Sequence, residues 1–174
     1  MVIFLTGERG VGKSTALRRA VAGCGLGIGG FMTDFGESRY AESKDLRLLP
    51  WSEAPDFSAG ETCALLGPGG RQVFPEVFDG LGSRLLLSAA GDDACDLILL
   101  DELGFLEADA KHFRAAVLSV LAGPKPVLGV VRQGLGAWRD APLGELWEVT
   151  KENRDALPRR LRKRLSSLFP AAFL

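Results

Sequence analysis

The sequence predicts an α/β fold: a three-layer sandwich in which helices cover both faces of a mostly parallel β-sheet, with antiparallel hairpins at one edge. Short apolar runs suited to buried strands alternate along the chain with segments of helical periodicity, the pattern of parallel sheets with crossover helices. Residues 35–75 break this alternation with short strand-like pieces separated by Gly and Pro, which predicts the hairpins. The length of 174 residues suits one well-cored domain, so residues 1–174 are expected to form a single domain.

The first half of the chain contains the hairpins and two of the expected helices. Strands are expected at 2–5, 28–33, 45–49 and 62–66, and helices at 14–22 and 79–90. The helix at 14–22 would bury Leu17, Ala20 and Val21, and Gly91 would end the helix at 79–90.

The second half alternates strand and helix. Strands are expected at 97–100, 127–131 and 146–149, helices at 108–121 and 157–168, and a loop around Trp138 at 134–144. The last helix would place Leu157, Leu161, Leu165 and Leu168 on one apolar face. Residues 169–174 form an apolar end that packs on the core or makes a self-association patch, so a monomer or a weak homo-oligomer is expected.

Composition excludes several classes of function. A formal net charge of −1 and 47% hydrophobic residues describe a globular protein without a field that attracts polyanions. Cys24, Cys63 and Cys95 are too widely spaced for a C-x-x-C site and are interpreted as free thiols of a reducing cytoplasm. The single histidine, His112, rules out a multi-histidine metal site and disfavours a Ser/His/Asp triad. No run is long enough for a membrane span and no leader precedes the first strand, so a cytoplasmic protein is expected.

The segment between the first strand and the first helix fits the phosphate-loop pattern G-x-x-x-x-G-K-[ST]. In such a loop, glycines let backbone N–H groups converge on phosphate oxygens, the lysine reaches the β and γ phosphates, and the hydroxyl binds Mg²⁺. A chance match in a glycine-rich chain is disfavoured because a strand precedes the motif and a helix follows it. The segment therefore predicts nucleoside-triphosphate binding by Gly7, Glu8, Arg9, Gly10, Val11, Gly12, Lys13, Ser14 and Thr15.

Two carboxylates follow the apolar run at 97–100, at the end of the strand where open α/β sheets bind ligands. Asp101 is expected to hold Mg²⁺ together with Ser14, and Glu102 to polarise a water for attack on the γ phosphate. The alternative is an Asp-Glu pair that caps the next helix. Glu107 is interpreted as structural, at a helix start that favours an acidic residue.

An Asp-Glu pair in this position is typical of the RecA-like order of P-loop NTPases. In that order an extra strand separates the phosphate-loop strand from the acidic one, so 127–131 should lie between 2–5 and 97–100. The strand near 147–149 should lie on the other side of 2–5. Arg132 would then face the γ phosphate and stabilise transition-state charge, the alternative being a surface arginine.

Taken together, these features resemble the small P-loop nucleoside-triphosphatases of the THEP type. The resemblance spans nearly the whole chain and is carried by four segments, 7–15, 29–33, 101–107 and 149–155, whose sequences are GERGVGKST, GGFMT, DELGFLE and VTKENRD. It implies Mg²⁺-dependent hydrolysis of ATP, GTP and other nucleoside triphosphates, with slow turnover. It also implies site roles for Thr33, Asn153 and Arg154, the last two near the base.

The chain departs from the resembled family at two places. Residues 34–39 replace an acidic, Arg-containing segment with DFGESR, and Arg132-Gln133 stands where relatives have His then Arg. These departures predict an altered apparatus around the γ phosphate that could lower the rate without removing binding.

Two other functions are compatible with the sequence. A nucleotide or small-molecule kinase would share the phosphate loop, but it would need a lid with several arginines over the acceptor. Arg9, Arg18, Arg19 and Arg39 are available, yet no arginine-rich lid stands out between the phosphate loop and the acidic pair. A nucleotide-dependent switch could dock on a protein or nucleic acid through the terminal-helix cluster Arg159, Arg160, Arg162, Lys163 and Arg164. A solvated helix face explains that cluster more simply.

Overall fold

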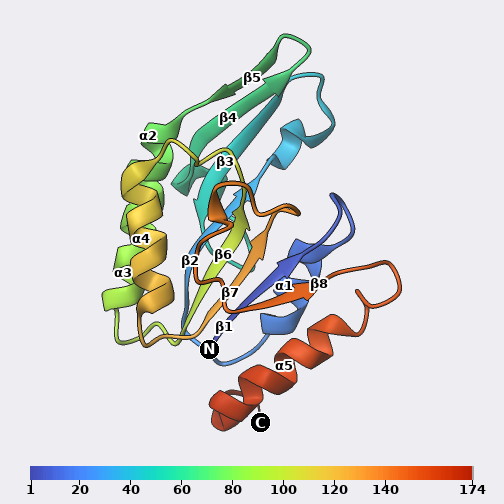
Figure 1. Cartoon of the computed structure of the whole chain (residues 1–174), viewed down its shortest axis with the longest axis vertical. Coiled ribbons are helices and arrows are strands. Elements are labelled where there is room, and N and C mark those ends of the chain that lie inside the picture. The colour runs from blue at the N-terminus through green and yellow to red at the C-terminus, as the bar shows by residue number, and fades with distance from the viewer. Residues whose placement is uncertain (174) are drawn as a thin grey trace.

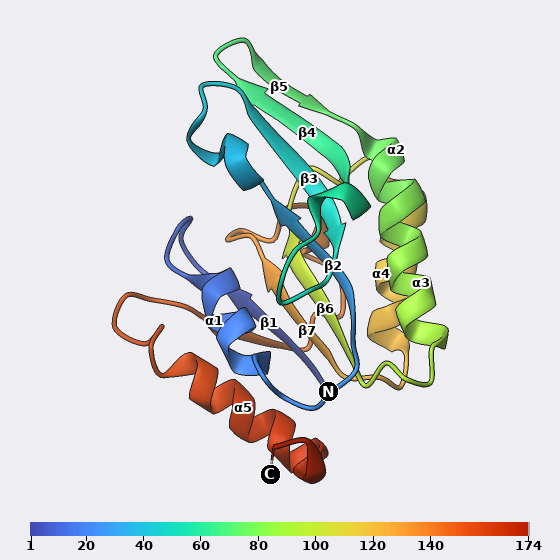
Figure 2. The ribbon, with the colours of Figure 1, turned by 180° about the vertical axis from the view of Figure 1, so that it is seen from behind.

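In a computed structural model describing residues 1–173, the chain forms one eight-stranded sheet with helices on both faces (Figures 1 and 2). The strand order is β5-β4-β3-β2-β6-β7-β1-β8. The strands are β1 (Val2–Thr6), β2 (Ile28–Asp34), β3 (Lys44–Pro50), β4 (Glu61–Gly67), β5 (Gly70–Val73), β6 (Leu97–Leu103), β7 (Val127–Val131) and β8 (Glu145–Glu148). The predicted three-layer α/β fold is confirmed.

The parallel part of the sheet has the predicted RecA-like order. β7 pairs in parallel with both β1 and β6, so it separates the phosphate-loop strand from the strand that carries Asp101. β8 pairs with the other side of β1, also in parallel. This order sets the carboxyl ends of β6, β7 and β1 side by side at one edge.

The hairpin extension lies on the other side of β2, as predicted. β2 pairs antiparallel with β3, β3 with β4, and β4 with β5, so the chain turns back three times beyond the parallel strands. Figure 1 shows these strands reaching away from the helices, at the end of the molecule opposite α5.

Alternation of side chains along the strands builds two cores. Phe4, Ile98 and Leu100 point to the face covered by α3 (Ser83–Gly91) and α4 (Lys111–Ala122). Ile3 and Leu99 point to the opposite face, covered by α1 (Lys13–Val21) and α5 (Leu157–Leu168). Figure 2 shows α1 with α5 and α3 with α4 as two separate helical layers. Strands buried on both faces explain the continuous apolar runs in the sequence.

The observed helix boundaries correct three expectations. The helical segment expected at 79–90 begins earlier, at α2 (Pro75–Val77), and continues through a π-helical stretch (Phe78–Gly82) into α3. Pro75 suits a first helical turn because its missing N–H needs no partner there. The helix expected at 108–121 starts at Lys111, because turns occupy the preceding residues. α1 covers Lys13–Val21, one residue earlier than expected at each end, and buries Leu17, Ala20 and Val21 as predicted.

Smaller differences affect the second half of the chain. The last strand is Glu145–Glu148, and Val149 follows it with its N–H donating to Thr6 O at 2.8 Å. α5 has the expected bounds and buries Leu157, Leu161 and Leu165, but Leu168, which was expected on the same apolar face, is 47% exposed.

The end of the chain packs on the core, and the three cysteines, which all lie within residues 1–173, form no disulfide. Phe173 packs against the core beside α5, and the Gly25 N–H donates to Ala172 O at 3.2 Å; Leu174 lies outside the described residues. Cys24, Cys63 and Cys95 are free thiols, and burial raises the pKa of the Cys63 thiol to about 12. In residues 1–173 no helix is both long and apolar enough to cross a membrane.

A substitution at Gly30 tests the close contact between β2 and β6. Its φ is +108°, and a Cβ there would lie 2.0 Å from Leu99 O. We therefore expect Gly30→Ala to cost about 3 kcal/mol or more of unfolding free energy, measured by urea denaturation.

The matched control for this variant is Gly80→Ala. A Cβ at Gly80 would meet no heavy atom within 4 Å, and the residue lies in a helical segment. This change should raise the unfolding free energy by about 0.5–1 kcal/mol. Equal stability of Gly30→Ala and the wild type would contradict the close packing of β2 on β6.

Candidate active site

The phosphate loop connects β1 to α1 and has the backbone conformation of an anion cradle. Gly7, Gly10 and Gly12 have φ values of +138°, +77° and +111°, which residues with a side chain rarely adopt. A Cβ on Gly7 would lie 2.5 Å from Val149 O, so the loop also needs glycine to pack against the segment after β8. α1 follows directly, with its first-turn N–H groups and its positive dipole end at the loop.

Lys13 begins α1 and folds back over the loop. Its Nζ donates to Gly7 O at 3.0 Å and to Glu8 O at 2.9 Å, and the residue is only 7% exposed. Burial lowers the pKa of the Lys13 ammonium, while the charges of Glu102 and Asp101 act in the opposite direction. The ammonium thus lies at the loop that the sequence predicts to bind phosphate.

Ser14 and Asp101 meet across the site although 87 residues separate them. The Ser14 hydroxyl donates to Asp101 Oδ1 at 2.7 Å. Asp101 is buried at the carboxyl end of β6, and burial raises the pKa of its carboxyl to about 6 despite the Ser14 hydrogen bond and the nearby Arg18. Ser14 and Asp101, the two residues predicted to hold Mg²⁺, therefore lie in direct contact.

The chemistry of this pair fits a divalent cation. No described donor makes a hydrogen bond to the buried Asp101 Oδ2, and Arg18 lies 3.9 Å from it. Residues 1–173 contain no cluster of three or more His, Cys, Asp or Glu that could hold a metal. One carboxylate and one hydroxyl, completed by waters and phosphate oxygens, match the way proteins hold Mg²⁺ in nucleotide sites.

Glu102, one residue after Asp101, points toward a different group. Its Oε1 lies 3.6 Å from Arg132 Nε, so the predicted base and the predicted charge-stabilising arginine form an ion pair. The register between β6 and β7 shifts between Asp101 and Leu103, and the Asp101–Glu102 peptide bond is cis. Arg132 is thus a partner of Glu102 rather than an isolated surface arginine.

The guanidinium of Arg132 also stacks on the ring of Phe105, with its Cζ 4.4 Å from the ring centroid. Arg71 from β5 places its Cζ 4.3 Å from the same centroid. The two arginines come from opposite parts of the sheet and share one aromatic ring. Phe105 is 39% exposed, so the stack is partly open to solvent.

A cavity of about 510 Å³ connects these groups. Thr33 lies on its wall and donates to Asp101 O at 3.4 Å. The phosphate end of the cavity is lined by Arg9, Ser14, Thr15, Arg18, Thr33, Asp34, Asp101, Glu102 and Arg132. Its other end is lined by Phe35, Arg39, Leu46, Leu66, Arg71, Phe78, Phe105 and Leu106.

Asp34 links two arginines at the end of β2. Arg39 contacts it at 2.7 Å and Arg18 at 3.5 Å. Burial raises the pKa of the Asp34 carboxyl, but the Gly36 N–H and the two guanidinium groups outweigh it, so the net pKa is lowered. The altered segment at 34–39 therefore forms an ordered ion-pair cluster at the cavity.

Glu107 is structural, for a different reason from the predicted helix start. It lies in a turn before α4 and is only 2% exposed. One carboxylate oxygen accepts hydrogen bonds from the Gly104 N–H and from Trp138 Nε1, the latter at 2.7 Å. Burial raises the pKa of this carboxyl, and the two donors partly counter that effect. Glu107 thereby joins the segment after Glu102 to the loop around Trp138.

The tail motif forms a turn beside the phosphate loop. Both polar atoms of the Asn153 amide bind backbone: Oδ1 accepts from Thr150 N at 2.9 Å, and Nδ2 donates to Glu148 O at 2.8 Å. Asn153 thus fixes the turn. The Arg154 Cδ lies 3.7 Å from the position of a Cβ on Gly12, so this turn flanks the loop on the side away from Asp101.

Three members of the basic cluster on α5 bind groups of the same chain. Arg164 pairs with Glu145 at 2.5 Å, Arg160 lies 4.5 Å from the Trp147 ring centroid, and Arg162 donates to Ala22 O. These contacts favour the solvated helix face over a nucleic-acid surface.

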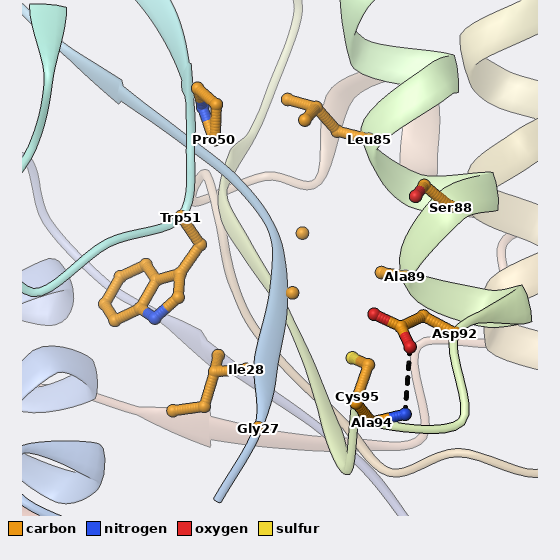
Figure 3. Close-up of a pocket in the computed structure, with 12 residues that line it drawn as sticks. Gly27, Ile28, Pro50, Trp51, Leu85, Ser88, Ala89, Asp92, Ala94 and Cys95 are labelled. Atoms are coloured by element: carbon orange, nitrogen blue, oxygen red, sulfur yellow. Dashed lines mark hydrogen bonds between the residues drawn. The ribbon is translucent and has the colours of Figure 1, made fainter. Parts of the chain in front are cut away.

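A second cavity of about 320 Å³ lies at the opposite edge of the sheet, beside the amino ends of β2 and β6 (Figure 3). Trp51, Ile28 and Leu85 supply apolar walls, and the Asp92 carboxylate accepts a hydrogen bond from Ala94 N at 2.9 Å. This cavity is therefore separate from the phosphate loop.

Comparison with known proteins agrees with the fold and identifies the family. A family model described as NTPase matches residues 2–162. The nucleoside-triphosphatase THEP1 of Methanosarcina barkeri is 31% identical over 180 residues, which cover 95% of this chain and 98% of the relative. The THEP1 of Methanocaldococcus jannaschii is 33% identical over 167 residues, covering 90% and 92%. The crystal structure of THEP1 from Aquifex aeolicus has the same fold, with a TM-score of 0.72, 24% identity, and coverage of 95% and 99%.

The phosphate loop, the strand order and the matched family define a P-loop nucleoside-triphosphatase. Within that class, the chain belongs to the THEP1 family. Sequence reasoning identified the loop and the acidic pair but missed Arg71 and the exposed Phe105 ring. Arg71 lies in a short hairpin strand without any motif, so no pattern marks it as a site residue.

The Glu107 contact yields a testable stability effect. Glu107→Ala would leave the Gly104 and Trp138 N–H groups without their acceptor, and should cost about 2–4 kcal/mol of unfolding free energy. Glu107→Gln keeps an oxygen acceptor and should cost less than about 1 kcal/mol. Denaturant unfolding followed by tryptophan fluorescence measures both.

The pH dependence checks the same contact. Because the native carboxyl has a raised pKa, the folded wild type holds its proton more tightly than the unfolded chain, and its stability falls as pH rises through that range. The stability of Glu107→Gln relative to wild type should therefore increase from pH 4 to pH 7. A pH-independent difference would contradict a buried, ionisable Glu107.

Proposed function

We propose that this chain, acting as one domain over residues 1–174, hydrolyses nucleoside triphosphates to diphosphates and phosphate with Mg²⁺. ATP and GTP are the proposed substrates. Other nucleoside triphosphates are proposed as well, because the phosphate loop binds the phosphates and does not select the base. The observation that carries the proposal is the 2.7 Å contact between Ser14 and Asp101, with Glu102 next in sequence.

The loop residues Gly7 to Thr15 bind the phosphates in this proposal. Lys13 Nζ, which donates to the loop carbonyls of Gly7 and Glu8 here, exchanges them for β and γ phosphate oxygens. Ser14 and Asp101 would hold Mg²⁺, which when bound neutralises charge on the phosphate oxygens. Thr33 lies within the same cavity wall and supports Asp101 through its backbone oxygen.

Glu102 and Arg132 divide the chemistry at the γ phosphate. Glu102 accepts a proton from the attacking water, and Arg132 offsets the charge that develops on the phosphoryl oxygens. Their 3.6 Å ion pair keeps both groups at the cavity before substrate arrives. A γ phosphate that draws the guanidinium away would free Glu102 to act as base.

The base of the nucleotide is proposed to lie on the other side of the loop. Arg154 flanks Gly12 there, carried by the turn that Asn153 fixes, and a guanidinium can stack on any base. Stacking without selective hydrogen bonds supports a loose base preference.

Glu102→Gln tests the assignment of the base. A phosphate-release assay should show a rate lower by about 10²–10⁴, the usual contribution of general-base catalysis. Affinity for a non-hydrolysable triphosphate, measured by calorimetry, should stay within about threefold, because Glu102 makes no contact that binding requires.

The control for this experiment is Glu61→Gln, at an exposed position that begins β4. It should leave both quantities unchanged. Phosphate release at the wild-type rate by the Glu102 variant would exclude Glu102 as the base.

A further inference from the structure

The hydrolysis proposed above uses only the phosphate end of the 510 Å³ cavity. The other end lies beyond Glu102, between the segment 34–39, the hairpin strands and the helix after Pro75. Its floor is apolar, with Leu46, Leu66 and Phe78, and the cavity as a whole, at about 510 Å³, falls in the range of about 300–1,000 Å³ found for small-molecule sites. A site for water alone would need neither this space nor these apolar walls.

The same end carries an aromatic ring and a cation that has no carboxylate partner. Phe105 is partly exposed, and the Arg71 guanidinium lies 4.3 Å from its centroid. Among the ion pairs formed within residues 1–173, Arg39 is matched by Asp34 and Arg132 by Glu102, whereas none involves Arg71. A ligand that adds a planar ring and an anionic group would complete this arrangement.

Phe35 gives the cavity a second aromatic wall of the same kind. Arg39 Cζ and Lys44 Nζ each lie 6.0 Å from its ring centroid. Cations therefore lie beside two of the aromatic rings that line the cavity, Phe35 and Phe105. Planar bases stack on such rings whatever the identity of the base. A phosphate can also accept two parallel hydrogen bonds from one guanidinium group.

The nucleotide whose phosphates occupy the loop does not compete for this end. The turn carrying Arg154 follows β8 and flanks Gly12, whereas this end of the cavity is lined by residues of β3, β4 and β5, on the other side of the sheet's parallel strands. The γ phosphate, expected beside Lys13, Asp101 and Glu102, would lie between the two regions. A molecule in the cavity would therefore face the γ phosphate on the side from which an in-line nucleophile approaches.

We propose that the Phe35, Arg71 and Phe105 end of the cavity binds a nucleoside monophosphate that accepts the γ-phosphoryl group of the bound triphosphate. A phosphate oxygen of the monophosphate forms a bond to the γ phosphorus, and the bond from that phosphorus to the β–γ bridging oxygen breaks. The products are two nucleoside diphosphates. The proposal rests on triphosphate binding as described above, and it makes phosphate release the reaction that occurs when water takes the acceptor position.

The two reactions place different demands on Glu102. Water must lose a proton to attack, so hydrolysis needs a base. A phosphate monoester has its second pKa near about 6 and at pH 8 offers an oxygen that is already deprotonated. Transfer therefore depends much less than hydrolysis on Glu102, and the Glu102→Gln variant separates the reactions.

The experiment uses γ-labelled ATP, Mg²⁺ and each of AMP, GMP, CMP and UMP at 1 mM and pH 8, with products separated by thin-layer chromatography. We expect label in the diphosphate made from at least one monophosphate. In Glu102→Gln, release of labelled phosphate should fall about a hundredfold or more while transfer falls less than tenfold. Arg71→Gln should lower the ratio of transfer to hydrolysis at least tenfold, and the matched control Arg159→Gln, on α5, should leave that ratio unchanged.

Direct binding keeps the test independent of turnover. Calorimetric titration of the four monophosphates into the chain saturated with a non-hydrolysable ATP analogue should give binding that Arg71→Gln weakens at least tenfold, with Arg71→Lys intermediate. Absence of binding by all four, or label appearing only in free phosphate, would overturn the acceptor site while leaving hydrolysis intact. Transfer without phosphate release would instead remove the proposed hydrolysis and keep the acceptor site.

Discussion

The hydrogen bond from the Ser14 hydroxyl to Asp101 is the contact on which the site depends, because it joins the start of α1 to the end of β6. The two residues belong to different crossover units, and only the insertion of β7 between β1 and β6 gives them their spacing. Burial raises the pKa of the Asp101 carboxyl, so keeping this group ionised is unfavourable unless cations or donors compensate. A site that retains a costly buried carboxylate without a full set of hydrogen bonds is organised for a ligand rather than for stability.

The edge hairpins form one wall of the cavity. The parallel strands alone supply the phosphate loop and the two acidic residues, while β3, β4 and β5 add Leu46, Leu66 and Arg71 to the cavity wall. Arg132 and Arg71 approach the Phe105 ring from opposite parts of the sheet. The extension therefore encloses the end of the cavity at which the acceptor is proposed to bind.

Much of this architecture follows from local sequence pattern. The loop 7–15 and the pair at 101–102 are short motifs with strict physical requirements, and together they predicted the confirmed strand order. Helix boundaries were harder to predict where contacts between residues far apart in the sequence determine them. The helix expected from 108 starts at Lys111, in a region where Glu107 binds Trp138, which is 31 residues further on. The Asp34 ion pairs and the contact between Arg71 and the Phe105 ring likewise depend on pairing between strands, which local sequence periodicity does not predict.

In the proposed mechanism, Ser14 and Asp101 form one cation site together with the bound nucleotide. The most direct test of this site is a titration of Mn²⁺, standing in for Mg²⁺, followed by electron paramagnetic resonance in the presence of a non-hydrolysable triphosphate. We expect one bound Mn²⁺ per chain, with an affinity that falls at least tenfold in both Ser14→Ala and Asp101→Asn. Unchanged Mn²⁺ affinity in these two variants, with the nucleotide still bound, would contradict the proposed cation site.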